Sequence, residues 1–534
     1  MKRLSLWRAL PFAVLIIFTA PLLIVLSSLF GNYSENWFHL YEFVLLDYVS
    51  SSLILVTGVA ISVFVIGTTT AWTVTNYNFP GKRVFEWALI LPLAIPPYIL
   101  AYTFTGLFDS YGDANNLMRS VFNLNNSQVF FPSVRNIYGA IIVFAFTLYP
   151  YVYLVSRSAF INQSKSMKEA ARILGMNQLQ VFYKLALPII RPAAIGGTML
   201  VIMETLSDFG AVDHFAIQTF TTGIFRTWYG LYDIQTAMQL ASLLLLTVGV
   251  FYMIERNSRG NAIYTTNNSS FSPNMEEKLN GYRAFTAFLI CLMPIFIGFI
   301  LPIIELSVWA FEVNLAFFNS KFLNTSLNTI SLSLGSGILC AGLALLINFS
   351  IRFKPGTLVK RFSGLLSIGY AVPGLILAVG IVQLLVRIDI LVSSLDIVLT
   401  GSIFGLVLAY LIKTYALANS SIESGYERIS QSLDDSSRVL GSSGLSMLIN
   451  IHTPLMKTAF LTSVLLVMSD IVKELPATLI LRPFNFETLA VSTYIYASEE
   501  RMLQAAAPAI AIVLVGLIPI IFLSKMIRSS RLGE

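Results

Sequence analysis

The chain has 534 residues, of which 56% are hydrophobic and only 12% are charged, and its formal net charge is +6. Soluble domains carry about 25% charged residues, so this composition excludes a water-soluble fold. The basic residues flank apolar segments and form no patch interleaved with aromatic residues, so nucleic-acid binding is not indicated. The two cysteines and three histidines are scattered, so we expect no disulfide, bound metal or cofactor.

Apolar runs of about 20 residues, the length with which an α-helix crosses the hydrocarbon core, recur along the whole chain. Hydrocarbon cannot satisfy backbone polar groups and the runs are continuous, so we expect an all-α polytopic bundle rather than a membrane β-barrel. The first run exceeds the apolar core of a secretory signal and is interpreted as a retained span. The twelve expected spans are 10–30, 51–73, 85–108, 137–159, 193–214, 236–255, 284–309, 326–350, 362–386, 400–420, 457–480 and 505–525.

Most Lys and Arg residues fall in alternate segments between these spans. The positive-inside rule places such segments in the cytoplasm, and both termini are among them. The sequence therefore predicts a multi-pass protein of the cytoplasmic (inner) membrane, with both termini cytoplasmic. Two long loops, 160–192 and 421–456, are expected on the same cytoplasmic side.

The two halves of the chain repeat each other. An offset of 266 residues relates the segment 169–175 to 435–441, and the same offset relates the prolines and acidic segments that follow. The further matched positions are Pro188 with Pro454, 208–211 with 474–477, and Thr222 with Thr488. Equivalent loops on one side indicate a parallel repeat of two six-span halves.

The repeat defines the expected domain limits. The first half is residues 1–260 and the second half is residues 281–534. Between them, residues 261–280 are rich in Asn, Ser and Thr, which is typical of a cytoplasmic linker.

Each repeated loop is predicted to form two short helices separated at a glycine, Gly175 or Gly441, because glycine accepts a left-handed turn. We expect Asn177 to cap the restarted helix of the first loop, and Ser442 or Ser443 that of the second. The restarted helices present apolar residues at helical spacing: Leu179, Phe182, Tyr183 and Ala186, and then Leu445, Leu448 and Ile449. A single face of this kind also fits a helix on anionic lipid, but two related copies favour docking onto a symmetric partner.

The first loop resembles the EAA loop of ATP-binding-cassette importer permeases. The residues that carry the resemblance are Glu169, Ala170, Ala171, Gly175 and Pro188. The second loop keeps Arg438, Gly441 and Pro454 but departs from the pattern, with Asp435 and two serines in place of Glu-Ala-Ala. The resemblance implies a type I importer fold in which these nine residues belong to the loops that engage two copies of an ATPase subunit.

The chain has no GxxxxGK(S/T) phosphate loop, so we expect it not to be an enzyme and ATP to be used by the partner subunit. The segments 473–478, 481–490 and 496–501 resemble the fused ferric-iron permeases, and the similarity in architecture extends over essentially the whole chain. That resemblance implies an extracytoplasmic iron-binding protein as a further partner, and alternating access as the mechanism.

Other cargoes and classes remain open at this point. Fused thiamine permeases share the architecture, and sulfate, polyamine and phosphonate permeases share the loop motif. A secondary transporter with twelve spans would use buried charges for ion coupling, but it has no need of the duplicated loop. A membrane enzyme is disfavoured because the loops contain no pair of nucleophile and base.

Ionisable residues lie inside the fifth and eleventh expected spans, where each costs about 3 kcal/mol near the membrane centre. They are Glu204, Asp208, Asp470, Lys473 and Glu474. We interpret them as a possible lining of the pathway or gate, where carboxylates suit a hard cation, and local ion pairing is the alternative. The tyrosines Tyr98, Tyr149 and Tyr151 could also contribute to the pathway, but the favoured interpretation is that they are anchors at the membrane interface.

Overall fold

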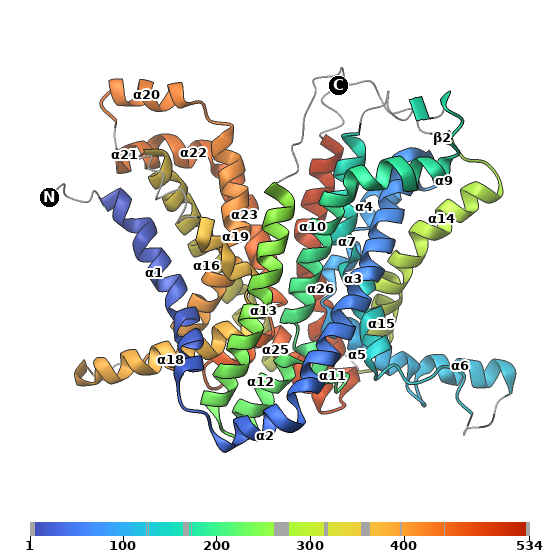
Figure 1. The fold of residues 1–534 in the computed structure, drawn as a ribbon, viewed down its shortest axis with the longest axis horizontal. Helices are drawn as coiled ribbons and strands as arrows, with labels where there is room; N and C mark the ends of the chain where they lie inside the picture. The colour runs from blue at the N-terminus through green and yellow to red at the C-terminus, as the bar shows by residue number, and fades with distance from the viewer. Residues whose placement is uncertain are drawn as a thin grey trace.

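The computed structural model describes residues 6–123, 125, 128–163, 170–171, 173–260, 277–313, 319–353, 364–395, 398–442 and 444–529. Within these residues the chain is an almost wholly helical bundle (Figure 1). Ten helices are long and apolar enough to cross a membrane, and the number rises to twelve if two bent pairs each count as one span. The predicted all-α polytopic fold is therefore confirmed.

Long helices form most of the bundle, and short helices continue or connect them. The long helices are α1 (Leu6–Ser27), α3 (Leu45–Asn76), α7 (Ile137–Ile161), α10 (Leu187–Ser207), α13 (Ile234–Gly260), α14 (Tyr282–Ile295) continued by α15 (Leu301–Glu312), α16 (Ser320–Phe353), α18 (Gly374–Leu391), α19 (Ile403–Glu427), α23 (Lys457–Val472) and α26 (Met502–Ser529). The short helices are α2 (Glu35–Phe43), α4 (Lys82–Ala88), α5 (Pro97–Phe108), α6 (Asp113–Phe122), α9 (Gln178–Gln180), α11 (Gly210–His214), α12 (Phe220–Tyr229), α20 (Gln431–Val439), α21 (Leu445–Met447), α22 (Thr453–Leu455), α24 (Pro476–Leu481) and α25 (Leu489–Ser498).

Each half is built around a core of three helices. Helices α3, α7 and α10 pack together in the first half, and α16, α19 and α23 pack together in the second. Glycines bring the first core close: a Cβ added at Gly67 would lie 2.7 Å from Cβ of Val152. Small residues at such contacts allow helix backbones in a membrane to approach each other.

The first span of each half packs against the other half. Helix α1 lies along α16 and α18 of the second half, and α14 and α15 lie along α3 and α5 of the first half (Figure 1). Trp7 at the start of α1 contacts Phe349 edge-on, with ring centroids 4.9 Å apart. The halves are therefore interlocked rather than merely side by side.

A small sheet joins the end of the expected linker to the first half. Strand β2 (Glu277–Lys278) pairs in parallel with β1 (Tyr77–Asn78), which directly follows α3. The carboxylate of Glu277 also accepts a hydrogen bond from the side chain of Gln178 in the first repeated loop. Residues 261–276 of the expected linker lie outside the described residues, so the domain limits stay a prediction.

Three expected spans are interrupted. The third is bent by 89° between the helices on either side of Pro96, where consecutive prolines remove backbone donors. The fifth and eleventh end earlier than the expected residues 214 and 480: α10 stops at Ser207 and α23 at Val472. In the fifth and eleventh spans the chain resumes as a short helix, α11 or α24, after a break that contains an acidic residue.

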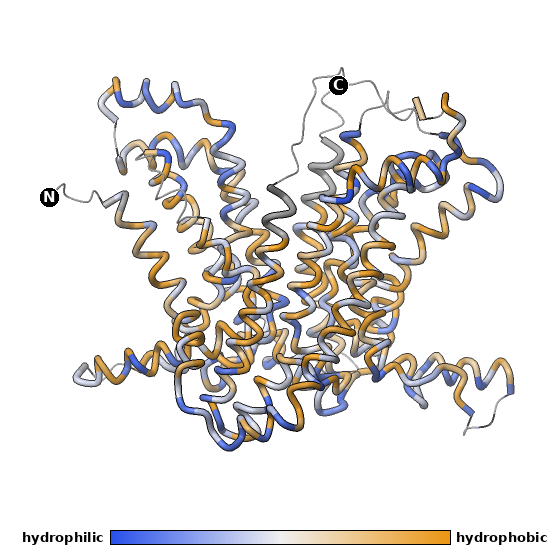
Figure 2. The backbone as a smooth tube through the Cα atoms, viewed as in Figure 1, coloured by the Kyte–Doolittle hydropathy of each residue, from blue (hydrophilic) through white to orange (hydrophobic). Residues whose placement is uncertain are grey.

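The two ends of the bundle differ. Helices α9, α20, α21 and α22 lie at one end, at the top of Figure 1, where α1 also begins and α26 ends. Helices α2, α6, α11 and α12 lie at the opposite end. Apolar residues dominate the band between them, and hydrophilic residues gather toward both ends (Figure 2). We call the first end the loop face; its orientation toward the cytoplasm remains a prediction.

Candidate functional site

The two repeated loops have the left-handed glycine turns that the sequence predicts. Gly175 has φ +78° and Gly441 has φ +83°. A Cβ added at either glycine would meet no described atom within 4 Å, so the backbone conformation, not lack of space, requires glycine here.

Each loop exposes the same four apolar positions. In the first loop Ile173, Leu174, Leu179 and Tyr183 are 86%, 79%, 70% and 62% exposed. The residues 266 positions later, Val439, Leu440, Leu445 and Ile449, are 87%, 85%, 58% and 55% exposed. The other members of the predicted apolar faces, Phe182, Ala186 and Leu448, are buried in the protein. The loop face therefore carries two matched apolar surfaces, which we call the paired loop surfaces.

The predicted caps are confirmed in one loop only. Asn177 forms a capping box with Gln180, accepting from its backbone N–H at 2.8 Å. In the second loop Gly444 with φ +59° occupies the N-cap position, so the expectation for Ser442 is wrong; a second glycine turn moves the restart, and Ser442 contacts Ser446 instead. Ser443 lies outside the described residues.

The EAA-like residues have different surroundings in the two loops. Glu169 lies outside the described residues, Ala170 is exposed and Ala171 is buried. Pro188 and Pro454 both lie just after a π-helical turn, Val181–Ala186 or Leu448–His452, which is a local distortion of the helix next to a residue that has no N–H to donate. Asp435 and Arg438 form an exposed ion pair with each other at 3.1 Å.

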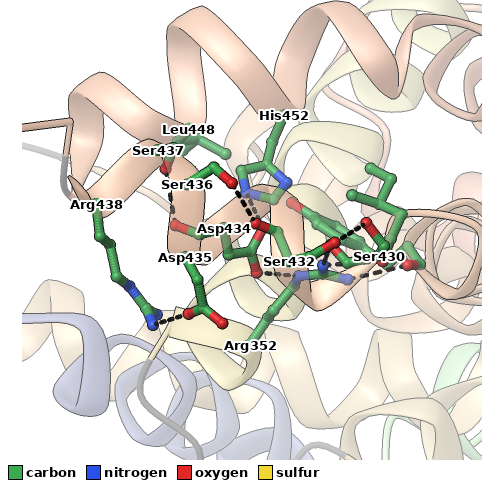
Figure 3. Close-up of polar contacts among 12 residues, drawn as sticks. Arg352, Ser430, Ser432, Asp434, Asp435, Ser436, Ser437, Arg438, Leu448 and His452 are labelled. Carbon is green, nitrogen blue, oxygen red and sulfur yellow. Dashed lines mark hydrogen bonds and ion pairs between the residues drawn. The ribbon is translucent and has the colours of Figure 1, made fainter. Parts of the chain in front are cut away.

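The acidic residue that ties the second loop to the bundle is Asp434, which the sequence reasoning missed. Its Oδ2 accepts from Nε of Arg352, at the end of α16, over 2.6 Å (Figure 3). The same guanidinium donates to the carbonyl oxygens of Tyr426 at 3.0 Å, and of Ile429 and Ser430 at 2.9 Å each. Arg352 thus joins the ends of α16 and α19 to α20. The available signal was an arginine at the end of a span together with a second aspartate beside Asp435.

His452 completes this joint between the second loop and the bundle. Its ring is fully buried against Phe349 and Tyr426, with centroids 5.2 and 5.5 Å away. Its Nε2 lies 3.3 Å from Oδ1 of Asp434, although the geometry is not that of a hydrogen bond. Burial lowers the pKa of His452; the charge of Asp434 opposes this shift, and the smaller effect of Arg352 adds to it. The imidazole is therefore neutral at pH 7.

The first loop is held differently. Trp72 of α3 packs against Phe160 and Phe182, with ring centroids 5.3 and 5.2 Å apart, respectively. Phe160 corresponds to Tyr426 at the offset of 266 residues. The two loops thus present similar surfaces. Within the part of the chain that the structure describes, aromatic packing attaches the first loop and a buried ion pair attaches the second; Lys168, which corresponds to Asp434 at the same offset, lies outside that part.

All five ionisable residues that the sequence singled out line one cavity at the centre of the bundle. It encloses about 760 Å³, part of it open to solvent. The ionisable residues in its wall are Glu204, Asp208, Lys413, Asp470, Lys473 and Glu474. The repeat offset relates Glu204 to Asp470 and Asp208 to Glu474, so each half contributes an equivalent pair of carboxylates.

Two of the carboxylates shape the breaks in the spans. Asp208 Oδ1 accepts from the backbone N–H of Ala211 at 2.9 Å, at the start of α11. Glu474 accepts in the same way from Ala477 and Thr478, at 3.0 Å each, at the start of α24. A carboxylate at a helix start satisfies free N–H groups and complements the helix dipole, which explains why the chain restarts there.

Lysines neutralise part of the acidic charge in the cavity. Lys473 Nζ lies 3.2 Å from Asp470 Oδ1, which is the local ion pair considered as the alternative. Lys413 Nζ lies 3.4 Å from Glu474 Oε1. The sequence reasoning missed Lys413, although a lysine inside the expected span 400–420 is the same kind of signal as the residues it did select.

The interpretation of the tyrosines as interface anchors is wrong. Tyr98 and Tyr151 line the central cavity, and Tyr149 is fully buried. These side chains pack inside the bundle because their spans face the other half of the protein.

Comparison with known proteins agrees with this architecture. Residues 63–256 match the family model of the binding-protein-dependent transport system inner membrane component. The chain is 25% identical over 488 residues to the Fe(3+)-transport system permease protein FbpB 2 of Haemophilus influenzae, covering 90% of each protein. It is 30% identical over 214 residues to the sulfate transport system permease protein CysT of Salmonella typhimurium, covering 39% of this chain and 73% of that protein. It is also 30% identical over 141 residues to the molybdenum transport system permease protein ModB of Escherichia coli, covering 26% of this chain and 58% of that protein.

The membrane bundle, the paired loop surfaces and the charged central cavity define a polytopic transport permease. The chain belongs to the family of binding-protein-dependent transport system inner membrane components, the permeases of ATP-binding-cassette importers. It is a multi-pass protein of the inner membrane, and its relatives are named as transport permeases rather than enzymes.

Proposed function

We propose that this chain is the fused permease of a ferric-iron importer, in which one polypeptide supplies both halves of the pathway. Similarity over 90% of the chain to an Fe(3+)-transport permease is the observation that carries the proposal. The sulfate and molybdenum permeases match only 39% and 26% of this chain, so neither match extends over the two halves together.

The charge of the central cavity supports a cation as cargo. Four carboxylates and two lysines line its wall, so its formal charge is negative when all are ionised. A wall of this sign attracts cations and repels a dianion such as sulfate, because charges in a cleft with low-dielectric walls interact strongly. Carboxylate oxygens are also the ligand type that hard cations prefer.

ATP hydrolysis belongs, in this proposal, to a separate ATPase subunit present in two copies. The paired loop surfaces support it: two matched apolar patches on one face suit two copies of one partner. An extracytoplasmic iron-binding protein would deliver cargo to the opposite end of the bundle. Closure of the ATPases draws the two loops together, and the halves rock about the cavity by alternating access. This orientation places the loop face and both termini in the cytoplasm.

The test is uptake by vesicles that contain this chain, its ATPase subunit and its binding protein. Radiolabelled ferric iron is compared with sulfate and thiamine, with ATP and with a non-hydrolysable analogue. We expect ATP-dependent uptake of iron alone. Uptake of sulfate or thiamine would replace the cargo and keep the permease, whereas gradient-driven uptake without ATP would indicate secondary transport.

A further inference from the structure

The carboxylates of the central cavity have different partners in the two halves. On the second-half wall, Asp470 pairs with Lys473 and Glu474 with Lys413. Among the described residues no ion pair involves Glu204 or Asp208, their equivalents on the first-half wall. Both lysines act on Glu204 only at longer range. The uncompensated negative charge therefore lies on the first-half wall.

Asp208 also keeps a carboxylate oxygen available. Its hydrogen bonds to the backbone of α11 all use Oδ1, and within the described part of the chain no hydrogen bond uses Oδ2. Glu474 differs, because Oε1 contacts Ala477 and Lys413, and Oε2 contacts Thr478. Both carboxylate oxygens of Glu474 therefore accept hydrogen bonds, whereas Oδ2 of Asp208 has no hydrogen-bond partner among the described residues.

A phenol is placed beside these carboxylates. Tyr98 is only 3% exposed and lines the cavity, and its hydroxyl has no hydrogen-bond partner among the described residues. It interacts electrostatically with Asp208 and Glu474. A buried hydroxyl without a partner is unfavourable, so a ligand that it contacts restores a lost interaction.

We propose that Glu204, Asp208 and Tyr98 form a transient station for a hard cation on the first-half wall of the cavity. Lys473 and Lys413 form ion pairs with the equivalent carboxylates of the second half, Asp470 and Glu474. The cargo is therefore held by the first-half wall. The identity of the cation as ferric iron rests on the proposed function, but the station itself does not. Carboxylate and phenol oxygens are hard ligands that suit a small, highly charged cation.

The station is built for weak binding. No group of three or more His, Cys, Asp or Glu residues in the described chain is placed to hold a metal ion. The cation therefore keeps part of its water or chelator, and the two lysines across the cavity repel it. Passage through a pathway requires binding that is strong enough for entry and weak enough for exit.

Terbium(III) tests the station in the purified full-length chain. It is a hard trivalent cation, and excitation of a nearby tyrosine sensitises its luminescence. We expect E204Q and D208N each to weaken Tb³⁺ binding at least about tenfold, or about 1.4 kcal/mol. Asn at position 208 still offers an oxygen that caps α11, so the fold is retained. Y98F removes only an unpartnered hydroxyl, and we expect it to lower the Tb³⁺ affinity without lowering the melting temperature.

The two halves provide the controls. Replacing both members of the second-half pair, D470N together with K473M, should weaken Tb³⁺ binding less than E204Q, because this double substitution leaves the formal charge of the cavity unchanged. K473M should strengthen binding several-fold, because it leaves Asp470 uncompensated. E499Q alters an exposed residue paired with Arg501 and reports on adventitious surface sites. Equal losses in the D470N/K473M double variant and in E204Q, or no loss in E204Q, D208N and Y98F, would overturn the station.

The result also separates this inference from the proposed function. If vesicles import another cargo while E204Q and D208N weaken Tb³⁺ binding as expected, the station stands and the iron assignment falls. If iron uptake is ATP-dependent but Tb³⁺ binds all variants alike, the permease assignment stands and the station falls.

Discussion

Arg352 and Asp434 form a mostly buried ion pair of 2.6 Å, and it fastens the second loop to the end of the second-half core. The guanidinium also donates to three backbone carbonyl oxygens, so it makes four hydrogen bonds in all. Because these contacts hold the Arg352 side chain on several sides, we expect a displacement of the second loop to move the ends of α16 and α19 as well. The first loop, held by aromatic rings, has no equivalent ion pair among the described residues.

D434N should therefore uncouple ATP hydrolysis from uptake. The substitution leaves Arg352 buried without its counter-charge, and breaking a buried pair in this way costs about 3–5 kcal/mol. We expect a lower melting temperature and more ATP hydrolysed per cargo transported in reconstituted vesicles. The matched control is D435N, which removes the neighbouring exposed carboxylate, and it should leave both quantities close to wild type. Equal effects of the two substitutions would contradict the role of the pair.

The same joint should loosen at acidic pH. The pKa of His452 is lowered in the folded protein, so the unfolded chain binds this proton more tightly. The stability of the joint is then full above the unfolded value of about 6.5 and falls as the pH drops toward the lower folded value. Amide hydrogen exchange of residues 431–456, corrected for intrinsic rates, should show faster local opening at pH 5 than at pH 7.5.

H452F provides the control for this pH dependence. Phenylalanine keeps the packing against Phe349 and Tyr426 but cannot be protonated. We expect the difference between pH 5 and pH 7.5 in this segment to shrink in the variant. An unchanged difference would assign the effect to another titrating group.

The repeat and the loop turns could be predicted from the sequence because they depend on local chemistry. Glycine at Gly175 and Gly441 reports a left-handed backbone, and acidic residues inside apolar runs mark a site that hydrocarbon would exclude. The offset of 266 residues also identified equivalent positions before any contact was known. These signals required no knowledge of which helices are neighbours.

What the sequence could not provide depends on packing between distant segments. Arg352 and Asp434 are 82 residues apart, and Lys413 and Glu474 are 61 apart, so neither pairing follows from local spacing. The tyrosines were misassigned for the same reason, because an aromatic residue near a span end looks alike whether it faces lipid or the other half. The spans that break at Asp208 and Glu474 were expected to be continuous, because an apolar run by itself does not indicate where a helix ends within it.

Bulky residues at the loop glycines should also uncouple transport. G175V or G441V places a β-branched residue at positive φ, which costs about 1–3 kcal/mol and strains the turn between the two short helices. We expect each to lower cargo uptake per ATP hydrolysed. Asparagine tolerates this conformation, so G175N and G441N should retain more coupling than the valine variants. Normal coupling in both valine variants would show that the turn is not needed.

Charged residues on the paired loop surfaces should prevent assembly with the ATPase. Burying a leucine stabilises a contact by about 1.5–3 kcal/mol, so L179E or L445E removes that gain and adds a charge that must be desolvated. We expect each single variant to weaken ATPase binding at least about tenfold, measured with the purified chain, and the double variant to lose it. Y111E alters an exposed aromatic residue just before α6, at the opposite end, and should bind normally. Because the two surfaces are matched by the repeat, a loss confined to one loop would mean that a single ATPase contact carries the assembly.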